Sequence, residues 1–542
     1  MVDLARGHVE AGGIRPAEVY YRMILKSCDP PTSPVDRMAL GEACRFFAAR
    51  AIAVNRHGEA CDWYQRALFA DPLAVEYMVE FVVRALLPRS MFKMARIIAA
   101  RATRVEPDNK DAWRALAISC AALNEPEESV AAYERQLELD GDNPLTVNDR
   151  AIIAVNTGDY KTARAMASVL LDNPKHSGDA CHIRGLCEYR EGRHEKAIEW
   201  YRQALDRGSY DAAQVKWNMS LAMHSVGQYA EGWQLSECRG EQKSDEGMRL
   251  VMNRFQRPRM TPGDLDTPQR VHVHHEMGNG DAFAMVRYLD LLVEKGHDVR
   301  LETMDSMVSL LQRSFPRVHV LPRALDYPGA IGIPEFDVHI PMLSLPALFG
   351  TGIDTVPWKG AYIKADPCGN DIGPGAVGIC WSSGIRTDGL WIAEYGRRKS
   401  MHFDTFFPIV DALHKRGSVV VPLQVGPERN QLPSNIADIL PGKPSWDDTA
   451  SLIAKLDLVI TVDTAIAHLS CAMGKPTWIL CQRDGASWHW MCHRPGASWN
   501  ERSPWYPSAR LFRQDEFNRP HYWNDVVSQV ANELSSRLVI AA

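Results

Sequence analysis

The segment GEACDWYQRALFADP, residues 58–72, predicts a helix that carries a small residue in its first turn and is closed by an Asp-Pro pair. That small residue recurs along the chain in steps of 34 or 35 residues, at Ala60, Ala95, Ser129, Ala163, Ala197 and Glu231. Large side chains follow four positions later at Tyr64, Tyr133, Tyr201 and Leu235. So constant a period predicts an array of helical repeats, because a single irregular helical domain has no reason to keep it.

A period of 34 is that of tetratricopeptide repeats, in which each unit is a pair of helices that buries one face only against its neighbour. We therefore expect an α-helical tetratricopeptide solenoid over residues 1–245. The concave face of such an array usually binds a polypeptide. Self-association, or service as a rigid spacer, is the alternative role.

The periodicity changes after the stretch FQRPRMTPGDLDTPQR, residues 255–270, which is rich in Pro, Gly and charge. From VHVHHE (271–276) onward, strand patterns alternate with helical ones, and the alternation restarts at GAVGICWSSG (375–384). We expect a linker at 246–268, an N-terminal α/β lobe at 269–370 and a C-terminal lobe with a closing helix at 371–542. Ligands of such parallel sheets bind at the carboxyl ends of the strands.

Composition excludes several classes of protein. The 542 residues carry a net charge of −6, so no basic footprint indicates a nucleic-acid partner. No apolar run of about 18 residues predicts a membrane span. The 12 Cys residues include no C-x-x-C pair, which favours reduced thiols and a cytoplasmic location over a disulfide framework or zinc ribbon.

The motif EMGNGD, residues 276–281, follows the first predicted strand. Gly278 and Gly280 permit a tight turn close to a ligand, and Asp281 then starts a helix. Three interpretations remain open: a catalytic base at Asp281, a simple helix cap there, or a dinucleotide fingerprint with Glu302 on the ribose. Phe283 stands where that fingerprint requires its third Gly.

The segment VDTAIAHLSCAMGKP, residues 462–476, occupies the matching place in the second lobe. Asp463 ends a strand, and Thr464 and Ala465 open a helix whose free N–H groups and dipole favour a phosphate. His468 lies one turn on from Thr464, on the same face. The alternative is a capped helix with a hydrogen-bonded core histidine.

Two further motifs are expected beside the donor. LQVGPE (423–428) ends a strand and places Gln424 and Glu428 there, with Glu428 available to a ribose. GRRKSMHF (396–403) sets Arg397, Arg398 and Lys399 before a helix, where they neutralise a diphosphate or form a solvated charge cluster.

No metal site is predicted. His272 and His274 share a strand face, but no third ligand accompanies them. The Asp-x-Asp pairs, Asp140/Asp142 and Asp264/Asp266, fall away from the predicted strand ends and are expected in surface turns.

Taken together, the motifs resemble the bacterial family 9 glycosyltransferases, which include lipopolysaccharide heptosyltransferases, and above all their branch with N-terminal tetratricopeptide repeats. The resemblance extends from GQYAEGW near residue 227 to the C-terminus. It rests on GNGD, FDVHIPMLSLP (336–346), WSSG (381–384), LQVGPE, LDLVITVDTAIAHLSCAMGKPTWIL (456–480) and SPWYPSARLFRQ (503–514).

The resemblance implies a GT-B fold of two Rossmann-like lobes, and sugar transfer with inversion and without a metal cofactor. It implies Asp281 as general base and Lys399 as a contact of the donor phosphates. It further places Gly280, Gln424, Glu428, Asp463, Thr464, Ala465 and His468 on the donor side. Ala465 departs from the family's usual Gly and narrows the approach to a phosphate.

The expected function is transfer of a sugar from a nucleotide-sugar donor to a hydroxyl of a protein or peptide held by the repeats. A helical array joined to a GT-B enzyme resembles the plan of the eukaryotic O-GlcNAc transferase. One alternative is the same chemistry on a lipid-linked or polysaccharide acceptor. Another is a non-catalytic scaffold. The repeats also allow a homo-oligomer.

Overall fold

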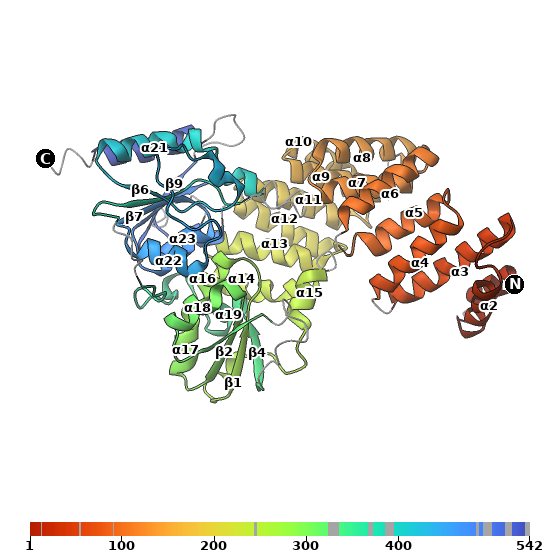
Figure 1. The fold of residues 1–542 in the computed structure, drawn as a ribbon, viewed down its shortest axis with the longest axis horizontal. Helices are drawn as coiled ribbons and strands as arrows, with labels where there is room; N and C mark the ends of the chain where they lie inside the picture. Colours follow the sequence, from red (N-terminus) through yellow and green to blue (C-terminus); the bar gives the residue numbers. More distant parts are fainter. Residues whose placement is uncertain are drawn as a thin grey trace. The chain divides into compact units, whose positions relative to one another are not determined.

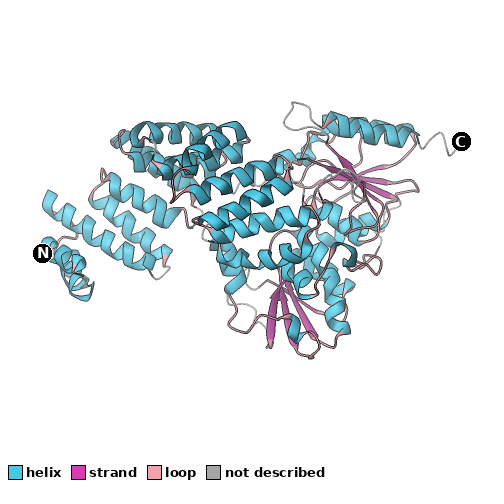
Figure 2. Cartoon of the chain, turned by 180° about the vertical axis from the view of Figure 1, so that it is seen from behind, coloured by secondary structure: helices cyan, strands magenta, loops and turns pink. Residues whose placement is uncertain are grey.

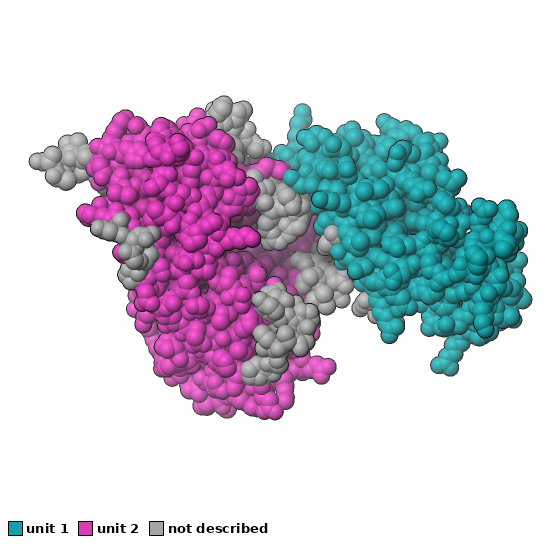
Figure 3. Space-filling model, viewed as in Figure 1, with its two compact units in different colours: residues 1–166, 386–393 teal, residues 167–385, 394–542 magenta. Residues whose placement is uncertain are grey.

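The chain divides into two compact units in the computed structural model (Figure 3). The first comprises residues 1–166 and 386–393, and the second residues 167–385 and 394–542. The structure describes the whole chain except residues 12–13, 54–55, 90, 142, 243–245, 324–334, 367–371, 385–394, 484–486, 492–500, 515–522 and 537–542. The division falls within the helical array, so the last repeats belong to the same unit as the α/β region. The predicted boundary at residue 245 stays a prediction.

The first unit consists of paired helices and confirms the repeat array. Its helices are α1 (Val2–Glu10), α2 (Ile14–Ser27), α3 (Pro34–Ala53), α4 (His57–Ala70), α5 (Val75–Phe81), α6 (Phe92–Val105), α7 (Lys110–Ala122), α8 (Pro126–Asp140), α9 (Pro144–Thr157) and the first part of α10 (Tyr160–Leu171). The recurring small residues lie near the starts of α4, α6, α8 and α10 and are fully buried. Small side chains there let the paired helices approach closely.

Four helices of the second unit continue the array: α11 (Ser177–Arg190), α12 (His194–Arg207), α13 (Ala212–Ser225) and α14 (Tyr229–Ser236). The prediction that Glu231 takes the small-residue position in α14 is wrong by one residue. Glu231 is exposed, whereas Gly232 is buried and donates to Gln228 O over 3.1 Å, as Ala197 does to the equivalent cap residue. Glycine is needed because a Cβ at this position would lie 2.7 Å from the His224 ring.

The α/β region begins with a four-stranded parallel sheet (Figure 1). Its order is β3-β2-β1-β4, from β1 (Arg270–His274), β2 (Asp298–Thr303), β3 (His319–Pro322) and β4 (Val338–Pro341). The connections contain α16 (Asn279–Met285), α17 (Leu289–Glu294) and α18 (Asp305–Ser314), as parallel pairing requires. The strand order reverses direction between β1 and β4, so their carboxyl ends form the first switch point.

A second parallel sheet has the order β6-β5-β7-β8-β9 and stands apart from the first (Figure 2). Its strands are β5 (Val377–Cys380), β6 (Val420–Pro422), β7 (Leu458–Val462), β8 (Thr477–Cys481) and β9 (Ala509–Arg513). One face packs with α21 (Phe403–Lys415) and α24 (Asn524–Ser536), the other with α22 (Trp446–Ala454) and α23 (Ala465–Ala472). Burial on both faces explains the nearly continuous apolar strands, and the two sheets are consistent with the expected GT-B fold.

The predicted linker at 246–268 includes helix α15 (Glu246–Asn253) and a short extended stretch. That stretch pairs with the outer edge of β4, because His339 N donates to Pro258 O over 3.0 Å and Met260 N donates to His339 O over 2.9 Å. The chain therefore enters the first lobe along a sheet edge, which it covers.

The last repeat shares a hydrophobic core with both lobes. Trp233 donates its indole N–H to the carbonyl of Thr351 over 2.9 Å, and Trp505 donates to the Tyr229 hydroxyl over 2.8 Å. Trp488 packs edge-on against Trp233, with ring centroids 5.3 Å apart. The motif GQYAEGW thus joins the helical array to the α/β region through buried aromatic side chains.

In the described part of the chain, no helix has both the length and the apolar character needed to cross a bilayer. Each of the ten described cysteines is buried.

Candidate functional site

The two loops singled out from the sequence lie against one another, because α16 of the first lobe packs on α23 of the second. Gly280 is in the first turn of α16 and His468 is in α23. A Cβ built on Gly280 would lie 2.8 Å from His468 Cδ2 and 3.6 Å from Ala465 Cα. The absence of a side chain at Gly280 is therefore what lets the strand-end motifs of the two sheets meet.

Asp281 is partly buried in the first turn of α16 and accepts a hydrogen bond of 3.2 Å from Gly278 N. Burial raises the pKa of Asp281 to about 6, although the Gly278 N–H and the Lys399 charge act to lower it. The negative charges of Asp463 and Glu276 contribute to the rise. A carboxylate of this kind exchanges protons near neutral pH, as a general base must. It also caps its helix, so the helix-cap interpretation describes a contact that the structure contains, and the role of Asp281 as a base stays a prediction.

The dinucleotide interpretation is not supported by the surroundings of this loop. Phe283 is fully buried in the core. The Glu302 carboxylate binds Arg254 at 2.7 Å and His272 at 3.0 Å, so it does not face a ribose.

His468 is buried, and its Nδ1 lies 3.0 Å from the Tyr506 hydroxyl. Burial lowers the pKa of His468 to about 4, with Asp463 opposing the shift and Lys399 adding to it. The imidazole is therefore neutral at physiological pH. Because the Tyr506 hydroxyl holds Nδ1 of this neutral ring, His468 faces α16 without adding a charge to the site.

Asp463 and Thr464 end β7 and begin α23. The Asp463 carboxylate accepts from Trp490 Nε1 at 2.7 Å and from Ser487 N at 3.3 Å. Thr464 caps α23 by accepting from Ile466 N at 3.2 Å. The capped-helix interpretation therefore describes the contacts of this segment, while Ala465 stays partly exposed at its start. The roles of Asp463, Thr464, Ala465 and His468 in donor binding remain predictions.

The second switch point lies between β5 and β7, where the strand order reverses. Beside it, the segments that follow β5 and β6 hold two buried oxygens without a hydrogen-bond partner among the described residues, Ser382 Oγ and Glu428 Oε2. Buried polar atoms normally have partners, so a ligand that donates hydrogen bonds suits this place. Gln424 differs, since its Oε1 accepts from Ser382 N at 2.9 Å and Trp381 N at 3.2 Å. It holds the loop after β5, and its role as a donor contact stays a prediction. Ser382 was not assigned a role from the sequence, although WSSG contains it.

Lys399 lies before α21, as predicted, with its ammonium 4.4 Å from the centre of the Tyr395 ring. Its charge acts on both Asp281 and His468. Of its neighbours, Arg398 is buried and Arg397 is partly buried, so these residues do not form a solvated cluster. Lys399 thus lies near enough to both strand-end motifs for its charge to act on them.

The metal-ligand candidates have other partners. His272 binds Glu302, and His274 Nε2 lies 3.2 Å from His339 Nδ1. Among the described residues, no cluster of three or more potential ligands could hold a metal ion. Asp140 pairs with Lys110, Asp264 caps a turn at Thr261, and Asp266 pairs with Lys295; Asp142 lies outside the described residues.

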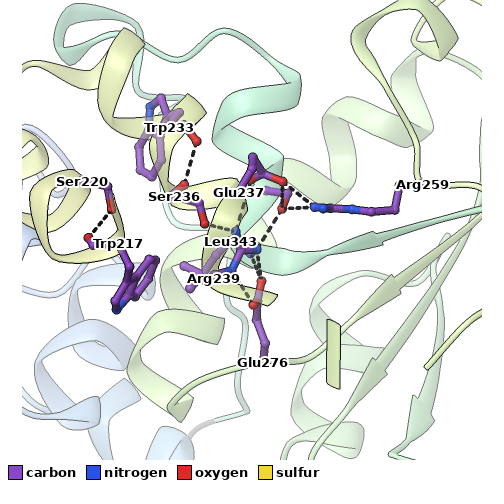
Figure 4. A network of polar contacts seen from close by, with 10 residues as sticks. Trp217, Ser220, Trp233, Ser236, Glu237, Arg239, Arg259, Glu276 and Leu343 are labelled. Atoms are coloured by element: carbon purple, nitrogen blue, oxygen red, sulfur yellow. Dashed lines mark hydrogen bonds and ion pairs between the residues drawn. The ribbon is translucent and has the colours of Figure 1, made fainter. Parts of the chain in front are cut away.

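One ion pair at the site could not be predicted from any motif or period in the sequence. Glu276, the second residue after β1, forms a fully buried ion pair with Arg239, which follows α14 in the turn η2 (Glu237–Glu241) (Figure 4). The two guanidinium contacts to the carboxylate are 2.6 and 2.8 Å long. The partners are 37 positions apart and belong to different structural elements, so neither period nor motif links them.

Comparison with known proteins agrees with this architecture. The tetratricopeptide-repeat family model matches residues 95–144 and 148–212, and the model for glycosyltransferase family 9 (heptosyltransferase) matches residues 394–480. The chain carries tetratricopeptide repeats and a family 9 glycosyltransferase domain. It is therefore a glycosyltransferase, and the family 9 match includes Lys399, Glu428 and the segment 463–468.

Among curated proteins, the chain is similar to protein FlbA of Caulobacter vibrioides, with 25% identity over 480 residues, covering 82% of this chain and 76% of FlbA. Solved structures of repeat proteins match shorter parts. A tetratricopeptide-repeat protein of Parabacteroides merdae is 13% identical with a TM-score of 0.33, covering 39% of this chain and 84% of its own. A repeat protein of Thermus thermophilus is 16% identical with a TM-score of 0.29, covering 34% and 98%.

The contact between α16 and α23 can be tested with Gly280→Ala. The added methyl group meets the His468 ring, so we expect overpacking to lower the free energy of unfolding by about 1–3 kcal/mol, measured by urea denaturation. Gly7→Ala is the matched control, since no atom lies within 4 Å of a Cβ there and alanine favours the helix. An unchanged midpoint for Gly280→Ala would show that the two helices do not meet closely.

Proposed function

We propose that the protein transfers a sugar from a nucleotide-sugar donor to a hydroxyl of a protein or peptide acceptor, with inversion and without a metal cofactor. The observation that carries the proposal is that Asp281, a carboxylate with a raised pKa where α16 meets α23, lies near enough to Lys399 for that charge to act on it. Asp281 accepts the proton and Lys399 stabilises the departing diphosphate. These are the two requirements of a single-displacement transfer.

In the proposed step, the acceptor oxygen attacks the anomeric carbon from the face opposite the leaving group. The hydroxyl proton passes to the Asp281 carboxylate as the new carbon–oxygen bond forms. The bond from the anomeric carbon to the diphosphate breaks, and its electron pair stays on the diphosphate. Lys399 and the N-terminus of α23 stabilise that growing negative charge.

Donor binding is assigned to the second switch point and to the end of β6 beside it. Ser382 Oγ and Glu428 Oε2, which have no hydrogen-bond partner among the described residues, follow β5 and β6, where a nucleotide ribose offers hydroxyl donors. Thr464 starts α23, the helix whose N–H groups suit the phosphates. Gly280, Gln424, Asp463, Ala465 and His468 shape this place by packing or by holding adjacent loops.

A polypeptide acceptor is favoured by the position of the repeats within the second unit. Burial raises the pKa of Tyr395 well above its usual value, and Asp463 and Asp281 add to the rise while Arg190, at the end of α11, opposes it. The repeat helix α11 therefore lies near enough to act on the same side chain as the proposed base. A polypeptide bound along the last repeats would be delivered to Asp281.

The residue roles predict different losses for two variants. Asp281→Ala removes the base, so we expect turnover to fall about 10²–10⁴-fold while donor binding persists. Lys399→Ala removes charge from the diphosphate site, so both turnover and donor binding should fall. Turnover is measured as sugar transfer or donor hydrolysis. Binding is measured by thermal shift with ADP-, UDP-, GDP- and CMP-sugars, since a ligand of the folded state raises its stability.

Lys415→Ala is the control for loss of a lysine, since the exposed Lys415 pairs with Asp411 on the surface of α21. Wild-type turnover in Asp281→Ala or Lys399→Ala would refute that residue's role. If the wild-type protein neither binds nor turns over any of these sugars, the proposal itself is wrong.

The pH dependence of turnover follows from the direction of the Asp281 shift. The base works as a carboxylate, and its pKa of about 6 means that the active form is lost as the pH falls through that value. We expect kcat/KM to decline below about pH 6, with a slope of one proton. A profile that stays flat down to pH 4.5 would show that Asp281 titrates normally or is not the base.

A further inference from the structure

The Arg239–Glu276 pair uses every hydrogen-bonding group of the guanidinium. Besides Glu276, Arg239 Nη1 donates to Ser236 O at 2.9 Å and to Glu237 at 3.2 Å, and Nη2 donates to Ser344 Oγ at 2.8 Å. Both members of the pair are at most 1% exposed. A buried pair persists only where geometry and extra hydrogen bonds are as complete as this.

Glu276 connects that pair to both strand ends of the first switch point. It is the second residue after β1, and its Oε1 also accepts from Leu343 N, the second residue after β4, at 2.9 Å. One carboxylate thus fixes the ends of the two strands between which a ligand is expected, and Arg239 fixes the carboxylate.

The residue after Glu276 shows that the loop is held in a costly conformation. Met277 has a backbone φ of 62°, a left-handed value that residues other than glycine seldom adopt. Its carbonyl lies 3.3 Å from His275 Nε2, so the His275 ring holds this carbonyl in place. Backbone strain of this kind persists only where the surroundings impose it, and it concentrates at functional sites.

Only the short turn at Gly278–Gly280 separates this anchored point from Asp281. The turn closes through the bond from Gly278 N to Asp281 Oδ2 and rests against His468. A shift of Glu276 would therefore move the start of α16 and with it the carboxylate.

We propose that Arg239, supplied by the segment that ends the repeat array, is a positioning residue that holds the loop carrying Asp281 in its working conformation. The inference rests on the proposed role of Asp281. It makes the end of the repeat array a part of the active site rather than an attached binding module. Separation of the array from the lobes would cost catalysis even on an acceptor that needs no repeats.

The test compares full-length Arg239→Met and Arg239→Lys with Arg259→Met. Arg259 pairs with Glu237 and bonds to Ser344 in the same network, but it makes no contact with Glu276. Arg239→Met should lower kcat at least about tenfold with the donor KM within about twofold, since misplaced catalytic groups lose rate rather than ground-state binding. Arg239→Lys should lie between, and Arg259→Met should match the wild type.

Two further readouts separate positioning from stability alone. Hydrogen exchange in Arg239→Met should speed up at residues 275–281 while the peptides of β7 and α23 keep wild-type rates. In Glu276→Gln, loss of a charge that raises the pKa of Asp281 should move the acid limb of the rate profile to lower pH.

The proposal is overturned if kcat of Arg239→Met stays within about twofold of wild type, or if Arg259→Met loses as much. It is equally overturned if exchange accelerates throughout the unit or the acid limb of Glu276→Gln does not move. Should the wild type turn over no nucleotide sugar, the proposed function fails, and exchange at residues 275–281 alone decides whether Arg239 holds the loop.

Discussion

Arg239 and Glu276 meet, with both side chains fully buried, where the last repeat joins the first lobe. Removing two charges from solvent costs several kcal/mol for each ion, and only a complete set of hydrogen bonds offsets that cost. The pair can therefore exist only if the array, the end of β1 and the end of β4 are assembled together. Around it, Tyr229 and Trp233 contribute to the core that contains Trp488 and Trp505. The repeats and the transferase are thus parts of one structure at this point.

The contact between the two lobes also depends on close packing and on buried hydrogen bonds. Gly280 lets α16 lie against His468, and Arg287, also from the first lobe, donates to the Trp505 carbonyl at 2.7 Å and to the Tyr362 hydroxyl at 2.8 Å. Arg287 lies 4.7 Å from the centre of the Tyr506 ring, whose hydroxyl binds His468. Along the chain, Asp281 therefore lies between Glu276, which an ion pair holds, and Arg287, which a cation–aromatic contact holds, so its segment is anchored on both sides.

Much of this arrangement could be predicted from the sequence, because it follows from local periodicity. The 34-residue step located the repeat helices, and the alternation of strand and helix patterns located both sheets and the loops that end them. The error at Glu231 arose because a strict period was continued where the chain inserts one residue before Gly232. Asp281 and His468 could be named as strand-end residues, because in each parallel sheet the segments that follow the strands lie at one edge of that sheet.

Contacts between distant segments could not be predicted in this way. Nothing near Arg239 indicates that its partner is Glu276, and the packing of Gly280 on His468 joins residues from different sheets. Gln424 shows that a predicted position at a strand end does not reveal what the side chain binds. Its place at a strand end suggested a ligand contact, but the hydrogen bonds that its side chain makes to the loop after β5 depend on how that loop folds.

We expect the end of the repeat array and the first lobe to form one cooperative structure. Native-state hydrogen exchange of the full chain in increasing denaturant tests it most directly, because cooperative units lose protection together. We expect peptides from α14 and η2 to lose protection at the same denaturant concentration as those from β1 and α16. Loss of protection in α14 and η2 together with α4–α8, at a lower concentration than β1 and α16, would contradict the account.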